Sequence, residues 1–254
     1  MTRPTVWSRL ARVRVTVGYV VALSAVMVTC VVLGPTVRDR ITAHASTNLH
    51  NLAHGRLGTL LGSAFVADIE SVYLWLPGLI CLLAVAELFW HGHRLVLVFF
   101  TGHIGATVLV AAGLVVAVRS GWLPWSITRV VDVGMSYGVM AVSGALTAAL
   151  PARARPWWFA WWLPAAAAVI VAAADFTDIG HVVALLIGMV ISIRLDSAVA
   201  WTPARRVLFA VGIGFGYAVL VYTPELAAVG VPASVLGVAV LSAVGLLARR
   251  RPSL

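Results

Sequence analysis

The chain has 254 residues, of which 61% are hydrophobic and only 11% are charged. Soluble domains are typically about 45–50% apolar and about 25% charged, so this composition excludes a soluble enzyme, a disulfide scaffold, a coiled coil and a disordered chain. The formal net charge is +9, but the 18 basic residues, all arginine, form short clusters between apolar runs. This distribution indicates membrane topology, and no nucleic-acid partner is expected.

Apolar runs long enough to cross a membrane recur along the whole chain. A transmembrane helix needs roughly 20 apolar residues to span a hydrocarbon core about 30 Å thick. Eight segments qualify, at residues 15–34, 72–90, 95–118, 130–150, 157–174, 179–193, 207–223 and 227–247. We therefore expect an all-α polytopic membrane protein in which residues 1–254 form a single integral membrane domain. The first segment lacks a cleavage signature and is expected to be an anchor.

The arginines predict the orientation of these segments. If the N-terminus is cytoplasmic, 13 of the 18 arginines lie on the inner side, which satisfies the positive-inside rule. Both termini are then cytoplasmic, and the expected location is a bacterial plasma membrane. Five arginines remain outside, namely Arg38, Arg40, Arg56, Arg119 and Arg129.

The one long outer connection runs from about residue 35 to residue 71. Its leucines recur at spacings of three to five residues around Asn48, His50, Asn51 and His54. This pattern predicts a short helix lying on the outer leaflet surface.

Ionisable or nucleophilic side chains inside spans are costly and suggest a functional site. The fourth segment enters from outside, which places Ser136 about six residues, or roughly 9 Å, below its outer end. The sixth segment also enters from outside, so His181 lies about one turn inside it. A serine and a histidine at similar depth on different helices are the pair that a nucleophile and its general base require.

Small residues surround both members of this pair. Gly134 and Gly138 flank Ser136 at two residues on either side, and Gly180, Ala184 and Gly188 form a small-residue ladder beside His181. The nucleophile elbow of soluble hydrolases also has Gly-x-Ser-x-Gly, but it needs a preceding strand, which a bilayer segment lacks. In a membrane, such spacings favour close helix packing, so we expect the fourth and sixth spans to contact each other.

The other intramembrane polar residues are expected to be structural. Ser143 and His103 are interpreted as packing residues, and Glu87 as a clasp with Arg94 or Arg194. Asp178 is expected to cap its helix, with orientation of the His181 ring as the alternative. No cluster of cysteine, histidine and carboxylate shares a depth and a face, so neither a metal nor an organic cofactor is expected.

Gly134-Met135-Ser136, together with His181 and its small residues, resembles the rhomboid intramembrane proteases, in particular the divergent rhomboid-like membrane proteins of actinobacteria. That family has Gly-x-Ser at the outer end of its fourth core helix. Its histidine lies near the outer end of the sixth core helix, followed by small residues at steps of three to four. The similarity extends to residues 56–65 and to Glu87 with Gly92 and Arg94, and so covers about residues 50–195.

The resemblance implies a six-helix rhomboid-like core over residues 1–195 and an additional helical hairpin over 196–254. It also implies a serine-type intramembrane endopeptidase that cleaves transmembrane substrates near the outer leaflet. In that reaction His181 removes the proton of Ser136, and Gly134 and Gly138 support the oxyanion site. The expected partners are membrane lipid and transmembrane-helix proteins, as substrates or clients.

Two alternatives remain open from the sequence. Rhomboid proteases place His-x-x-x-Asn early in the second helix, where this chain has Glu70-Ser71-Val-Tyr73-Leu-Trp75. A catalytically inactive rhomboid-like protein that binds transmembrane helices is therefore an alternative. A small transporter is another, but it predicts inverted repeats, and no internal repeat is evident.

Overall fold

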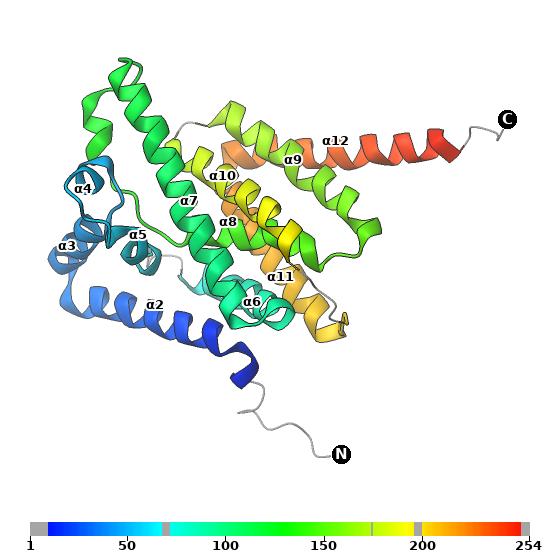
Figure 1. The fold of residues 1–254 in the computed structure, drawn as a ribbon, viewed down its shortest axis with the longest axis horizontal. Coiled ribbons are helices and arrows are strands. Elements are labelled where there is room, and N and C mark those ends of the chain that lie inside the picture. Colours follow the sequence, from blue (N-terminus) through cyan, green and yellow to red (C-terminus); the bar gives the residue numbers. More distant parts are fainter. Residues whose placement is uncertain (1–9, 68–71, 174, 196–199, 250–254) are drawn as a thin grey trace.

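The computed structural model describes residues 10–67, 72–173, 175–195 and 200–249, and in these residues it contains helices and no strand (Figure 1). The helices longer than three residues, short 3₁₀ turns apart, are α2 (Arg14–Leu33), α3 (Pro35–Ala45), α4 (Leu49–Ala53), α5 (Thr59–Gly62), α6 (Val72–Trp90), α7 (Gly92–Arg119), α8 (Ser136–Ala145), α9 (Arg155–Ala172), α10 (Phe176–Ile191), α11 (Pro203–Leu220) and α12 (Pro224–Arg249).

Each of the eight predicted segments overlaps one of these helices. Five helical stretches are long and apolar enough to cross a membrane by length and composition: Ala11–Leu33, Gly92–Arg119, Phe176–Arg194, Pro203–Leu220 and Pro224–Ala248. Two shorter apolar helices, Leu74–Trp90 and Ser136–Ala149, lie between them in sequence. The prediction of an all-α, multi-pass membrane protein is confirmed.

The fourth predicted segment begins later than its composition suggested. Residues 130–135 are not helical, and α8 starts at Ser136. The expectation that Ser136 lies six residues inside a helix is therefore wrong, because Ser136 is the first helical residue. Gly134 has a φ of 135°, which interrupts the helical backbone in a conformation that essentially only glycine adopts.

The backbone of residues 130–135 is bonded to the outer connection instead of to a helix. The Gly134 N–H donates to the Ser63 carbonyl oxygen at 3.0 Å, and the Thr47 N–H donates to the Asp132 carbonyl oxygen at 2.8 Å. The Asp132 N–H donates to the Ser46 hydroxyl at 2.9 Å. These bonds satisfy backbone groups that a membrane interior would otherwise leave unpaired.

The outer connection is folded into three helices, where the sequence predicted one. α3 was not expected, and α4 and α5 divide the leucine-rich stretch between them. Asn48 caps α4 by accepting the Asn51 N–H at 2.9 Å. The Asn51 side-chain amide in turn donates to the carbonyl oxygens of Ala43 and Ser46, at 3.0 and 2.8 Å. The connection is therefore a compact unit held by its asparagines.

α8 lies in the middle of the bundle and is buried from Tyr137 through Ala145 (Figure 1). It packs chiefly against α7 and α10. A helix surrounded by other helices has no lipid-facing stripe and can carry small residues on every side. The helix that begins with Ser136 is therefore the structural centre of the molecule.

α11 and α12 pack on different parts of this bundle. α11 lies along α6, where Gly212 meets the backbone of Leu82, and it also reaches α8, where Gly216 meets the Ser143 side chain. α12 packs along α9, and the Ser234 hydroxyl donates to the Trp161 carbonyl oxygen at 2.7 Å. The two helices thus fill the sides of the bundle next to α6 and next to α9.

Candidate active site

Ser136 is presented by the sharp turn that precedes α8. The positive φ of Gly134 directs the extended segment into the helix, so Ser136 provides the first helical N–H. The first N–H groups of a helix have no acceptor within that helix. The Ser136 side chain and its backbone N–H therefore lie together at a helix end that favours negative charge.

His181 lies in the second turn of α10, close to a well-capped helix start. Asp175 accepts the Thr177 N–H at 3.3 Å, and Asp178 accepts the Asp175 N–H at 3.2 Å, so the two acids form a capping box. The structure thus places Asp178 in a capping position. His181 faces the interior of the bundle, and the residue is only 4% exposed.

The imidazole of His181 is held between two aromatic rings. The Tyr137 ring meets it edge-on with ring centroids 5.6 Å apart, and the Tyr222 ring does the same at 5.8 Å. Neither ring nitrogen has a hydrogen-bond partner among the described residues. The histidine is therefore fixed in position by packing, with both nitrogens available for a proton or a ligand.

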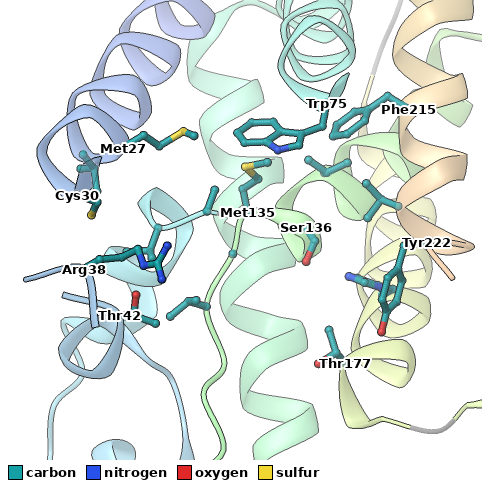
Figure 2. A pocket seen from close by; sticks show the side chains of 18 of the residues that line it. Met27, Cys30, Arg38, Thr42, Trp75, Met135, Ser136, Thr177, Phe215 and Tyr222 are labelled. Carbon is teal, nitrogen blue, oxygen red and sulfur yellow. The ribbon is translucent and has the colours of Figure 1, made fainter. Parts of the chain in front are cut away.

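Ser136 and His181 line one cavity of about 730 Å³, which we call the central cavity. Figure 2 shows Ser136 between Met135 and Tyr222, with Arg38 and Thr42 across the opening. Apolar side chains, including Trp75 and Phe215, form much of the remaining wall. A mostly apolar cavity of this size with a few convergent polar groups is typical of a ligand or substrate site.

Tyr222 is a cavity residue that the sequence analysis missed. It follows α11, and its hydroxyl is close enough to Asp178 to be affected by that carboxylate. Burial raises the pKa of Tyr222 to about 12, with a further contribution from the negative charge of Asp178. Its hydroxyl therefore stays protonated at any ordinary assay pH. No sequence pattern indicated Tyr222, because its contacts come from the folding of α11 against the bundle.

The small residues of α8 and α10 bring these two helices into contact. Gly188 lies against the Ala141 carbonyl group, and Gly144 lies against the Leu185 carbonyl group. Gly180 lies against the Tyr137 ring, and Ala184 is fully buried. The structure places Gly138 against the Phe99 ring of α7, whereas Gly134 is on the cavity wall. Ser136 and His181 thus line the same cavity because α8 and α10 pack so closely that their backbones are in contact.

A second serine–histidine pair lies behind Ser136. The Ser63 hydroxyl and Nε2 of His103 are 2.9 Å apart, and both residues are buried. They line a small hollow together with Asp132, Ser136 and Tyr137. Burial raises the pKa of the Asp132 carboxyl, although the hydrogen bond from Thr47 opposes this shift. From the sequence, His103 was expected to be a packing residue, and no pattern indicated Ser63.

Glu87 binds a different partner from the one predicted. Its carboxylate accepts the backbone N–H groups of Val15 and Thr16, at 3.0 and 2.8 Å, at the start of α2. The expected clasp with Arg94 or Arg194 is therefore wrong, since unpaired helix N–H groups bind the carboxylate instead. Of the segment that replaces the His-x-x-x-Asn motif, Glu70 and Ser71 lie outside the described residues, and Trp75 lines the cavity.

A comparison with protein families identifies a match. The model of a family described as rhomboid-like protein matches residues 11–197. No curated protein and no solved structure matches the chain. The matched region extends from α2 to just beyond α10, and so includes Ser136, His181 and most of the central cavity wall. Since the match covers well over half of the chain, this protein belongs to the rhomboid-like family.

Proposed function

We propose that this protein is an intramembrane serine protease that cleaves transmembrane proteins near the outer leaflet, with Ser136 as the nucleophile and His181 as the general base. The observation that carries the proposal is that both residues line the central cavity, with Ser136 at the N-terminus of a buried helix. Membership of the rhomboid-like family adds support.

The proposed reaction is acyl transfer followed by hydrolysis. His181 takes the proton of the Ser136 hydroxyl as its Oγ attacks the substrate carbonyl carbon. The backbone N–H of Ser136 stabilises the negative oxygen of the tetrahedral intermediate. The proton then passes from His181 to the departing amine, and water releases the acyl group by the same route.

The resting geometry is consistent with this chemistry. The His181 nitrogens have no partner among the described residues, so no hydrogen bond to Ser136 is formed without substrate. Catalytic hydrogen bonds are often long in unliganded enzymes and tighten when substrate binds. Tyr137 and Tyr222 pack against the imidazole and restrict its orientation.

The proposal includes a topology of eight spans in a bacterial plasma membrane with both termini in the cytoplasm. The arginine distribution supports this orientation through the positive-inside rule. Under this topology, α8 and α10 begin on the outer side, which places the dyad in the outer leaflet. Residues 1–195 are then the core, and residues 196–254 are an additional hairpin.

A catalytically inactive rhomboid-like protein is the second candidate. The observation that favours it is that Trp75 lines the cavity in the part of α6 where rhomboid proteases have the His-x-x-x-Asn motif, whose residues help to bind the oxyanion. Removing one oxyanion donor from a serine hydrolase typically costs about 100- to 1,000-fold in rate. Under this alternative, the central cavity binds a transmembrane helix and no bond is cleaved.

Labelling with a fluorophosphonate probe distinguishes the two candidates. We expect the purified protein in detergent at about pH 7.5 to be labelled, and Ser136→Ala and His181→Ala to abolish labelling. Two matched controls keep labelling: Ser143→Ala, which removes a buried serine from the same helix, and Ser63→Ala, which removes the serine paired with His103. Labelling that persists in Ser136→Ala contradicts the proposed nucleophile. No labelling of a folded wild-type protein favours the inactive candidate.

A further inference from the structure

A second large hollow lies on the outer side of the molecule, away from the central cavity. It has a volume of about 620 Å³ and lies between α4, the end of α7 and the 3₁₀ turn Trp125–Arg129. His50, His54, Arg119 and Arg129 contribute its polar groups, and Leu52 and Val115 contribute to its apolar floor. We call this hollow the basic groove. It shares no lining residue with the central cavity.

No carboxylate in the part of the chain that the structure describes forms an ion pair with the arginines of the basic groove. Arg119 and Arg129 are exposed, and neither forms an ion pair with a carboxylate in the described part of the chain. Desolvation lowers the pKa of His50, and the positive charges of His54, Arg129 and Arg56 lower it further. Basic side chains therefore converge here without an acidic partner among the described residues, and their combined charge attracts an anion from solution or from the membrane.

This cluster also accounts for an anomaly in the sequence. The positive-inside rule disfavours arginine near the outer ends of spans, yet five arginines are assigned to that side. Two of them, Arg119 and Arg129, line the basic groove, and Arg56 is close enough to affect His50. A binding role gives these arginines a reason to be retained where topology alone disfavours them.

The shape of the groove limits the kind of anion. Its floor is formed by apolar side chains of α4 and α7, and Trp125 lies at its edge, as aromatic residues do at membrane interfaces. A small inorganic anion would leave this floor uncovered, whereas an acyl chain would cover it. A zwitterionic headgroup would place its own cation among the arginines. The ligand that matches both the basic side chains and the apolar floor is a phosphate with a net negative charge joined to an acyl chain.

We propose that the basic groove binds an anionic phospholipid, with its phosphate between Arg119 and Arg129 and one acyl chain along Leu52 and Val115. This site is independent of the proposed protease activity, because it uses none of the residues of the central cavity. It assigns a ligand to the outer arginines and anchors the outer connection to the surrounding lipid.

Lipid titration of the purified protein in detergent, followed by native mass spectrometry, tests the site. The probes are phosphatidylglycerol, phosphatidylcholine and inorganic phosphate. The variant Arg119→Gln/Arg129→Gln removes two groove charges, and the matched control Arg40→Gln/Arg206→Gln removes two exposed arginines elsewhere. A third variant, Ala112→Trp, fills the floor without changing the charge. A cooperative thermal unfolding transition of each variant in detergent with phosphatidylcholine shows that the variant is folded.

We expect phosphatidylglycerol to bind more tightly than phosphatidylcholine by about fivefold or more. Since one arginine near an anionic lipid surface is typically worth about fivefold in affinity, the groove double variant should weaken phosphatidylglycerol binding by about 25-fold. The matched control should stay within about twofold of wild type, and Ala112→Trp should weaken both lipids. The proposal is overturned if both double variants lose phosphatidylglycerol affinity equally, or if the wild type binds phosphatidylglycerol no more tightly than phosphatidylcholine. Inorganic phosphate binding as tightly as phosphatidylglycerol overturns the lipid as the ligand.

Discussion

The Glu87 carboxylate holds Thr16 through two hydrogen bonds of 2.8 Å each, one from the backbone N–H and one from the hydroxyl. Both residues are buried, and they join the start of α2 to the end of α6. A carboxylate in this position satisfies N–H groups that have no helical acceptor and interacts favourably with the helix dipole. The first and second predicted spans are thus fastened together at one end.

Removal of this carboxylate should destabilise the fold. Glu87→Ala leaves buried N–H groups without an acceptor, and hydrogen bonds to charged groups typically contribute about 1.5–3 kcal/mol. We expect the free energy of unfolding in detergent to fall by about 2–3 kcal/mol. Glu225→Ala, which removes an exposed glutamate from the first turn of α12, is the control. A loss of the same size in the control would show that the Glu87 contacts are not the cause.

Substitution of Gly134 should impair the nucleophile more than the fold. An alanine at a φ of 135° is strained, at a cost of about 1–3 kcal/mol, and relief of this strain shifts Ser136. Because a misplacement of about 1 Å can cost about 100-fold in rate, we expect Gly134→Ala to lower the fluorophosphonate labelling rate by about that factor. Gly113→Ala on α7 has free space and should label normally. Normal labelling of Gly134→Ala would contradict this role of the turn.

A methyl group at Gly188 should separate α8 from α10. The added Cβ would overlap the Ala141 carbonyl group, which is backbone and cannot rotate away. Overpacking of this kind typically costs about 1–3 kcal/mol. We expect Gly188→Ala to lower the unfolding midpoint and to reduce labelling, since His181 moves with α10. Gly245→Ala has no neighbour within 4 Å and serves as the control. Equal effects of the two substitutions would argue against the close approach.

The two contacts of Tyr222 can be separated by substitution. Tyr222→Phe keeps the ring edge against His181 and removes the hydroxyl that interacts with Asp178, whereas Tyr222→Ala removes both. If packing positions the imidazole, Tyr222→Phe should label within about threefold of wild type and Tyr222→Ala about tenfold more slowly, because aromatic contacts are worth about 0.5–1.5 kcal/mol. Equal loss in both variants would assign the effect to the hydroxyl.

The carboxyl of Asp132 should make stability depend on pH. Its pKa is raised in the folded protein by burial, so the fold favours the protonated acid. The resulting stabilisation is present below the ordinary carboxyl pKa of about 3.9 and is lost as pH rises through the raised value. We expect Asp132→Asn to flatten the dependence of the unfolding midpoint on pH above about 4. Asp39→Asn, at an exposed position, should leave that dependence unchanged.

The sequence was sufficient to predict the long apolar helices of the bundle, because twenty-residue apolar runs have few alternatives in a bilayer. It was insufficient at residues 130–135. Val130, Val131 and Val133 have the composition of a span, but the backbone groups of Asp132 and Gly134 in the same segment are bonded to Thr47 and Ser63, more than 60 positions away. Hydropathy averages composition over a window and carries no information about such long-range hydrogen bonds.

The residues of the candidate site also fall into those that the sequence indicated and those that it did not. Ser136 and His181 were selected as candidates because an intramembrane serine and histidine at similar depth are rare and costly, and both line the central cavity. Tyr222 and Trp75 were not found, since an aromatic residue near a helix end is usually an interfacial anchor. Their place on the cavity wall depends on how α6 and α11 pack, and helix packing is set by three-dimensional contacts that a single sequence does not reveal.

The packing of α11 against Leu82 and Ser143 has a consequence for any shortened version of this protein. The family match ends at residue 197, before α11 begins. A chain trimmed to that match would lose Phe215, Val219 and Tyr222 from the cavity wall and expose the flank of α6 to detergent or lipid. The end of the family match is thus a poor guide to the shortest chain that keeps the cavity intact, and truncated or chimeric versions should keep α11 and α12 with the core.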